Sequence, residues 1–393
     1  MRPRGWVTVF KKEVIENARD KRTLANALLY GPLFGPVLFA AILGFVSTKQ
    51  QKDWDKPLEL PVVGAEYAPN LLRFLEQQSV VIKPAPADAE AAVRAQDADV
   101  VLRLTAQYGE AWSAGRPGPV DLLFDGSRQE AQKSVTRTEA LLQQYGRQTG
   151  VLRLQVRGIN PEVTQAVAVV RRDLSTPQSR AALILGIMPY LVILSSFIGG
   201  MYLAIDTTTG ERERQSLEPL LINPVLREEI MLGKLGATTL YALLSSLISI
   251  AAFVLCIRFV PSSGLGFELS LSWRAATLIG MIVAPVALLA ATLQTIVAAF
   301  ARTYREALTY LQFLIIIPII PSLLILLNPT KPVLAMYATP LMGQSLLINE
   351  LVRGDVLSVS HALVAAAGTV VMAGVFALIA MRLYHRESLA VAT

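Results

Sequence analysis

Residues 235–257 read LGATTLYALLSSLISIAAFVLCI, and this stretch contains no Asp, Glu, Lys, Arg or His. An apolar helix of about 20 residues spans the roughly 30 Å hydrocarbon core of a bilayer. Uncharged stretches of similar length also cover 27–46, 181–205, 275–301, 307–330 and 362–381. Six such stretches in one chain are too many for the core of a soluble protein. The sequence therefore predicts an α-helical polytopic membrane protein with six transmembrane helices.

The composition supports this class. Of all residues 53% are hydrophobic and 17% are charged, and the mean hydropathy is +0.47, whereas about 25% of the residues of a soluble domain are charged. The first apolar stretch starts at residue 27 and is longer than the hydrophobic region of a signal peptide, so we expect a retained span. The single cysteine, Cys256, leaves no intrachain disulfide.

Basic residues predict which side of the membrane each loop faces. Residues 1–26 hold seven Lys or Arg, 206–234 hold four, and 302–306 and 382–393 hold two each. The short loops on the opposite side hold four in total. The positive-inside rule then places both termini in the cytoplasm and the long block between spans one and two outside. We attribute the basic charge to topology and to contact with the lipid bilayer, with no nucleic acid bound.

The block 47–180 has the pattern of a folded extracytoplasmic domain. Runs typical of strands alternate with runs typical of helices, which predicts an α/β domain. The expected strands are 60–64, 79–83, 99–104, 120–124 and 151–157, and the expected helices are 69–77, 88–96 and a long one from about 127 to 149. We expect 160–180 to form a helical stalk that leads back into span two.

Three further segments have clear patterns. Residues 1–26 include apolar side chains at helical spacing with basic residues between them, which predicts a cytoplasmic amphipathic helix at the membrane interface. The segment 331–361 predicts one or two short helices at the extracytoplasmic interface. Pro318 and Pro321 predict a break in span five. Residues 181–393 as a whole hold spans two to six.

The chain has no motif for self-contained catalysis. The pattern GxxxxGK[ST] is absent, so we predict no phosphate-binding loop of that kind. The two histidines, His361 and His385, are too far apart for an HExxH zinc site. We therefore predict no catalytic residue, no metal site and no cofactor in this chain, which argues against an intramembrane enzyme.

The cytoplasmic segment 206–234 contains the most informative motif, GERERQSLEPLL at 210–221. Alternating charges precede a short apolar patch, a pattern that can insert into a partner's groove while charges pair at the rim. The same pattern also suits an interfacial helix that lies passively on lipid. The residues concerned are Glu211, Arg212, Glu213, Arg214, Leu217, Glu218, Pro219, Leu220 and Leu221.

The predicted spans contain polar but uncharged side chains. A charged relay would mark an ion path, and the six stretches hold no charge. Hydroxyls and amides remain, which either line a translocation path or join helices by hydrogen bonds. The candidates for such a path are Ser195, Ser196, Thr292, Gln294, Thr295 and Gln312.

Two segments resemble one transporter family. The string GERERQSLEPLLINPVLREEIMLGK at 210–234 is similar to the cytoplasmic loop of ABC-2 type exporter permeases, especially the sodium-extrusion (NatB-type) subgroup. The string KKEVIENARDKRTL at 11–24 resembles the start of the same subgroup. The layout of the whole chain also fits, with a large outer domain followed by five more spans.

This resemblance implies an ABC exporter permease. Two permeases, either two copies or a pair of paralogues, would each bind a separate cytoplasmic ABC ATPase, so that two ATPase copies supply the ATP and Mg sites. Glu211 to Leu221 would be the coupling helix that contacts the ATPase. The cargo would be Na⁺ or another monovalent cation. Alternatives are export of a peptide, antibiotic or lipid-like amphipathic molecule, and a membrane sensor whose outer domain binds a ligand. An Arg-rich, Ala-rich composition favours the inner membrane of a GC-rich bacterium.

Overall fold

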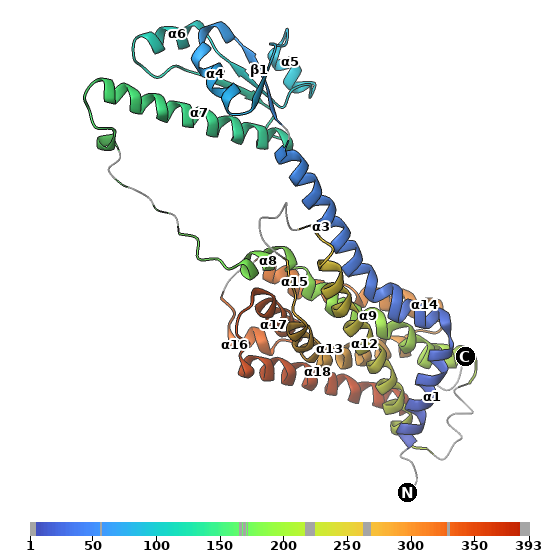
Figure 1. Ribbon diagram of the computed structural model, residues 1–393. Helices are drawn as coiled ribbons and strands as arrows, with labels where there is room; N and C mark the ends of the chain where they lie inside the picture. The colour runs from blue at the N-terminus through green and yellow to red at the C-terminus, as the bar shows by residue number, and fades with distance from the viewer. Residues whose placement is uncertain are drawn as a thin grey trace. The chain divides into compact units, whose positions relative to one another are not determined.

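A computed structural model describes residues 5–55, 57–164, 167, 170, 172–216, 225–261, 269–327 and 331–385. The chain divides into two compact units. Unit 1 comprises 1–50 and 174–393, and unit 2 comprises 51–173. The described part of unit 1 is helical and holds α1, α2, most of α3, α8–α10 and α12–α18, whereas unit 2 contains the strands and α4–α7 (Figure 1).

Within the described residues, the structure confirms six helices that are long and apolar enough to cross a membrane. Their extents are Lys21–Lys49, Met188–Glu213, Arg227–Ile257, Trp273–Phe300, Tyr304–Ile325 and Val359–Leu383. The corresponding elements are α2 (Lys21–Ala25), η1 (Asn26–Tyr30) and α3 (Gly31–Asp55); α9 (Met188–Ile205), η4 (Asp206–Gly210) and α10 (Glu211–Glu213); α12 (Arg227–Ile257); α13 (Trp273–Phe300); α14 (Tyr304–Leu314) and α15 (Ile319–Leu327); and α18 (Val359–His385). The predicted break in span five is confirmed, because residues 315–318, which end at Pro318, form a turn between α14 and α15.

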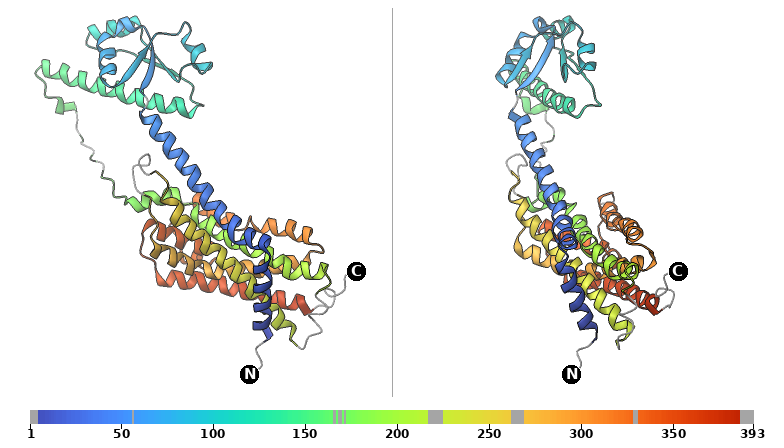
Figure 2. Two further views of the ribbon diagram at one scale, coloured as in Figure 1. Left: turned by 45° about the vertical axis from the view of Figure 1, so that its right-hand side comes forward. Right: turned by 90° about the vertical axis from the view of Figure 1, so that its right-hand side faces the viewer.

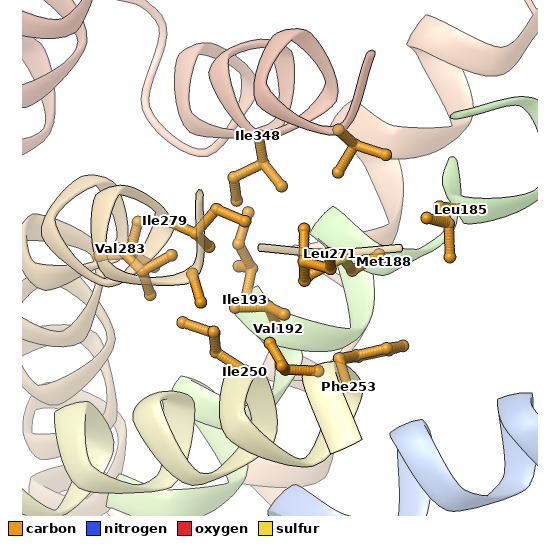
Figure 3. Packing of buried hydrophobic residues seen from close by; sticks show 14 of the residues in the cluster. Leu185, Met188, Val192, Ile193, Ile250, Phe253, Leu271, Ile279, Val283 and Ile348 are labelled. Carbon is orange, nitrogen blue, oxygen red and sulfur yellow. The ribbon is translucent and has the colours of Figure 1, made fainter. Parts of the chain in front are cut away.

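The core of unit 1 forms around α9. Most residues of α9 are buried, whereas few residues of α3, α14–α15 and α18 are. Apolar side chains of α9, α12, α13, the short helix α8 (Pro177–Leu185) and α17 (Met342–Arg353) meet in one cluster (Figure 3). It includes Met188 and Ile193 of α9 and Phe253 of α12, each fully buried. Burial of most of its residues fits the absence of any charged side chain from α9, and the exposed apolar faces of the other helices suit a bilayer.

The segment between spans five and six contains α16 (Leu334–Ala338) and α17. Gln344 holds α17 against α18, because its side chain accepts from Leu341 N at 2.8 Å and donates to Ala365 O at 3.0 Å and Thr369 Oγ1 at 2.7 Å. The predicted short helices are therefore present, and α17 packs into the core through Ile348. α13 and α18 run side by side (Figure 2).

Unit 2 is a small α/β fold, as the sequence predicts. Its four-stranded sheet has the order β2-β1-β3-β4, with β1 parallel to β2 and β3 and with β4 antiparallel to β3. The strands are β1 (Leu58–Val63), β2 (Val80–Lys83), β3 (Val100–Arg103) and β4 (Asp121–Phe124). The helices are η2 (Ala65–Tyr67), α4 (Pro69–Gln77), α5 (Ala89–Arg94), α6 (Ala106–Ser113), α7 (Gln129–Val156) and η3 (Pro161–Thr164).

The two faces of the sheet have separate apolar clusters. Leu60 and Leu102 on one face pack with Leu71 and Leu75 of α4 and with Val135 of α7. On the opposite face, Val101 packs with Ala89 and Val93 of α5. Alternate residues of β3 thus enter different clusters, which follows from the two-residue period of a strand.

The prediction of a fifth strand at 151–157 is wrong, because these residues continue α7 to Val156. The alternation of apolar and polar residues over these positions is also compatible with a helix, and a helix that has already formed extends at little cost. Here it ends where Gly158 takes the left-handed conformation, with φ 71°. The predicted helical stalk over 160–180 is also incorrect in its described parts. They contain η3, a non-helical segment at 172–176, and α8 from Pro177.

Candidate functional site

Most of the described part of the predicted coupling segment is helical. Asp206 to Glu213 continue α9 through η4 and α10, and Arg227 to Lys234 are the first two turns of α12. The sequence-based boundaries followed the first charged residues, but a helix end is set by backbone hydrogen bonds and caps. Five of the predicted contact residues lie outside the described residues: Leu217, Glu218, Pro219, Leu220 and Leu221.

The end of α9 takes part in a buried ion-pair network. We use this name for Lys12, Glu13, Glu211 and Lys234. The side chains of Lys234, Glu13 and Glu211 are 1%, 2% and 7% exposed. Lys234 Nζ bonds to Glu211 Oε2 and to the carbonyl of Thr207 at 2.5 Å, and it lies 3.8 Å from Glu13 Oε1.

The fourth member, Lys12, closes the network at the surface. Lys12 Nζ is 3.2 Å from Glu13 Oε1 and 3.2 Å from Glu211 Oε1, and its side chain is 44% exposed. Two cations thus face two buried carboxylates, so the four groups have no net charge when all are ionised, and the exposed carboxylate of Glu16 also lies 3.2 Å from Lys12 Nζ. Such pairing is needed because an isolated buried charge is very costly.

Burial and pairing have opposite effects on the titration of this network. Burial raises the pKa of the Glu13 carboxyl, and the nearby Lys234 ammonium opposes this rise. For Lys12, burial lowers the pKa, but the carboxylates of Glu13 and Glu211 outweigh it and raise the pKa above its usual range. Lys12 therefore stays charged at neutral pH, which keeps the two carboxylates compensated.

The next three charged residues bind within unit 1. Arg212 donates to the carbonyls of Ala299, at 3.2 Å, and Ala301. Glu213 Oε2 accepts from Tyr304 N at 2.8 Å. These bonds connect the end of α9 to the link between α13 and α14.

Arg214 makes the last of these contacts. Its Nη2 is 2.7 Å from Asp206 Oδ1, and the side chains of Arg214 and Asp206 are 57% and 27% exposed. Within the described residues 210–216 of the motif, Glu213 and Arg214 are thus the exposed charges, whereas Glu211 is buried in unit 1. The binding of an ATPase by these residues stays a prediction.

The amphipathic helix predicted near the N-terminus is present as α1 (Gly5–Arg19). Its apolar residues Phe10 and Val14 pack beside Leu203 of α9 and Tyr241 of α12. A Cβ atom added at Gly233 would lie 2.7 Å from Val9 Cβ and 2.8 Å from Trp6 O. The glycine therefore allows α1 and α12 to approach closely, and much of the apolar face of α1 contacts protein.

Five of the six candidate path residues are buried within unit 1. Ser195, Ser196, Thr292, Gln294 and Thr295 are buried on α9 and α13. Three of the hydroxyls donate to carbonyls of their own helix: Ser195 to Val192 O at 2.6 Å, Thr292 to Leu289 O at 2.8 Å and Thr295 to Ala291 O at 2.7 Å. The hydroxyl of Ser196 contacts that of Ser246 on α12. Gln312 is exposed on α14 and lies outside this group.

Gln294 joins α9 and α13 through a bond from Nε2 to Phe197 O. Its Oε1 atom is buried and has no hydrogen-bond partner among the described residues. A Cβ at Gly200 would be 2.6 Å from this oxygen, so any larger residue there would require the Gln294 side chain to move. These contacts join the helices, and whether the polar atoms also line a path stays a prediction.

Comparison with known proteins decides the family. A sequence model described as ABC-2 family transporter protein matches residues 32–382. The chain belongs to this family. Such a permease is a membrane transporter subunit and not an enzyme, and membership implies a partner ATP-binding subunit.

One curated relative of this ABC-2 permease aligns over nearly its whole length. The chain is 23% identical over 384 residues to the ABC transporter permease protein NatB of Bacillus subtilis (strain 168). The alignment covers 96% of this chain and 97% of the relative. The match confirms the resemblance drawn from 11–24 and 210–234.

Sequence reasoning missed Glu13 and Lys234 as members of a site in this permease. Both left a signal in the sequence. Val9, Glu13 and Asn17 are spaced by four residues, so a carboxylate lies on the buried stripe of α1. Lys234 directly precedes the uncharged stretch 235–257, and a lysine there was attributed to topology alone. Their proximity arises from the packing of α1 on α12.

Proposed function

We propose that this chain is the permease subunit of an ABC exporter, and that the segment following α9 contacts a separate cytoplasmic ATPase. The main support for the proposal is that side chains of α10 form hydrogen bonds or ion pairs with three other parts of unit 1, namely α1, α12 and the α13–α14 link. Lys12 and Lys234 bind Glu211, and Arg212 binds carbonyls of the link. A displacement of α10 by ATP-driven closure of the partner would therefore reach several spans.

The proposed complex contains two ATPase copies and a second permease, either identical or a paralogue. ATP and Mg²⁺ would bind to the ATPases. Contact would be made by the exposed Glu213 and Arg214 together with the apolar residues Leu217, Leu220 and Leu221 of the same motif. Apolar anchors with charges at the rim are typical of such interfaces.

Substitution of the apolar anchors tests this contact. Leu220→Asp and Leu221→Asp should each lower co-purification of the ATPase about 10-fold or more, since burying a carboxylate in an interface costs well over 1.4 kcal/mol. Leu174→Asp is the matched control, because Leu174 is 91% exposed and lies in the loop before α8. Undiminished co-purification of both variants refutes the proposed contact.

The charge distribution supports a cytoplasmic location for α1 and α10 and an extracytoplasmic location for unit 2, in a bacterial inner membrane. Single cysteines test this in a Cys256→Ser background. Ser113→Cys in α6 and Gln215→Cys after α10 are both at exposed positions. An impermeant maleimide added to spheroplasts should label Ser113→Cys, and should label Gln215→Cys only after permeabilisation. The opposite pattern would overturn the topology.

For the cargo, we propose Na⁺ or another monovalent cation. The support is the resemblance of 210–234 to the sodium-extrusion subgroup, and the buried oxygens of Ser196, Gln294 and Thr295 offer neutral ligands of the type that such cations accept. The test is ATP-dependent ²²Na⁺ movement in proteoliposomes that contain permease and ATPase. Movement of an amphipathic peptide or lipid probe without ²²Na⁺ would favour the alternative cargo, for which the broken, exposed span α14–α15 provides an apolar surface.

A further inference from the structure

We propose that Lys234 is a positioning residue for energy coupling, which makes α1, the α9–α10 end and the start of α12 move as one body. The inference rests on the proposed function, because it specifies how a displacement at α10 is passed on. Its basis is the buried ion-pair network, in which one ammonium group binds two other elements.

The geometry of Lys234 supports a bridging role. The residue lies on α12, and its Nζ atom bonds to Glu211 at the start of α10 and to Thr207 O in η4. The same atom is 3.8 Å from Glu13 of α1. At 1% exposure the side chain has lost its hydration. Separation of any of these elements would thus leave a buried charge without its partner.

The backbone conformation between α9 and α10 explains why the contacts of Lys234 would matter for coupling. Residues Asp206–Gly210 form a π-helical turn, η4. Such turns are rare and contain an extra residue, so they provide a place where a helix can change register. Without a restraint, a displacement of α10 could be absorbed at η4. The bond from Lys234 to Thr207 O holds this turn from within, and the bond to Glu211 holds the residue that follows it.

The contact between α1 and α12 reinforces the same unit. Gly233 directly precedes Lys234 and allows the backbone of α1 at Trp6 to approach α12. Asn17, one turn further along the buried stripe of α1, donates to the backbone carbonyl of Glu13 at 3.0 Å. The carboxylate of Glu13 lies between Lys12 Nζ, at 3.2 Å, and Lys234 Nζ, at 3.8 Å.

A purely structural role predicts a different outcome from a positioning role. If the network only avoids an uncompensated charge, removal of one cation and one anion together should restore normal behaviour. The double variant Lys234→Met with Glu13→Gln does this, and it keeps the direct bond between Lys12 of α1 and Glu211 of α10. If Lys234 positions the elements, this neutral variant should assemble normally but α1 and α10 should no longer be fixed to each other.

Distance measurement between spin labels separates the two roles. In a Cys256→Ser background, labels are placed at Lys11→Cys on α1 and at Gln215→Cys after α10, both exposed. Double electron–electron resonance is recorded on the full-length permease in nanodiscs, alone and in complex with its ATPase, without nucleotide and with trapped ADP–vanadate. Lys21→Met, an exposed lysine on α2, is the control for loss of a lysine.

The proposal expects one narrow distance in the wild type and in Lys21→Met, unchanged between the two nucleotide states. It expects loss of that single distance in the neutral double variant, together with a loss of ²²Na⁺ movement per ATP hydrolysed. A double variant that keeps the narrow distance would overturn the inference. So would a wild-type distance that changes on nucleotide trapping, because α1 and α10 would then move separately. Failure of the ATPase to co-purify with the wild type would contradict the proposed function instead. The distance measured on the permease alone would still test the role of Lys234.

Discussion

Gly199 of α9 allows a prediction that can be worked out from distances. A Cβ atom at this position would lie 2.2 Å from Ser245 Cβ and 3.0 Å from the carbonyl oxygen of Tyr241, both on α12. Carbon atoms in contact are about 3.5–4.0 Å apart, so Gly199→Ala requires a separation of roughly 1.5 Å between α9 and α12. The bond from Ser245 Oγ to Ser195 O, now 2.8 Å, would lengthen as a result.

The magnitude follows from two opposing contributions. Overpacking of a core costs about 1–3 kcal/mol, and replacing glycine by alanine inside a helix recovers about 0.5–1 kcal/mol. We expect Gly199→Ala to lower the free energy of unfolding by about 0.5–2 kcal/mol. Gly374→Ala on α18 is the matched control, because a Cβ there has no atom of the described structure within 4 Å. Gly374→Ala should therefore show only the stabilisation that comes from replacing glycine by alanine inside a helix.

Thermal unfolding of both purified variants in the same detergent measures the difference. Gly199→Ala should unfold at a lower temperature than the wild type, and Gly374→Ala at the same or a higher temperature. If Gly199→Ala is as stable as Gly374→Ala, then α9 and α12 do not pack as closely as the structure shows, and the reasoning about this core is wrong.

Three further predictions concern other parts of the chain. Gln344→Leu should cost about 1–3 kcal/mol in the same unfolding assay, because Leu341 N loses its buried acceptor; an unchanged unfolding temperature would contradict this. Leu60→Ala should destabilise unit 2 by about 2–5 kcal/mol, which is seen as faster limited proteolysis of unit 2 in the full-length protein, and equal rates would disprove it. Hydrogen bonds from Ser127 lower the pKa of Asp125, so its stabilising effect, present above about pH 3.9, is lost as the pH falls through the lowered pKa. The difference in unfolding temperature between wild type and Asp125→Ala should therefore disappear in acid, and a constant difference from pH 6 to pH 3 would rule out this origin.

The sequence predicted the spans and the strand–helix alternation of unit 2 because both depend on local patterns. An uncharged stretch such as 235–257 has few alternatives to a spanning helix. The four confirmed strands are short apolar runs between turns. The pattern at 151–157 was ambiguous between strand and helix, and the helix prevailed because α7 extends without interruption to Val156.

Charged residues showed the limit of local reasoning. Glu211 has the same sequence context as Glu213, and both were predicted to face a partner. In the structure Glu211 is buried beside Lys234, whereas Glu213 is exposed. Glu211 and Glu213 point to different sides of α10. Which residue points inward depends on the π-helical turn η4, and the sequence pattern did not predict this turn.

The amino-acid sequence alone determined that the chain crosses a membrane, where its spans lie, and which family it resembles. These properties follow from hydrophobicity summed over 20 or so residues and from short motifs. Only the tertiary structure decided that Glu13, Glu211 and Lys234 form one buried network, since these residues come from three elements separated by up to 221 positions. Their partners are set by helix packing, which allows α1 to approach α12 at Gly233, and the cost of burying a charge then dictates that each finds a counter-charge.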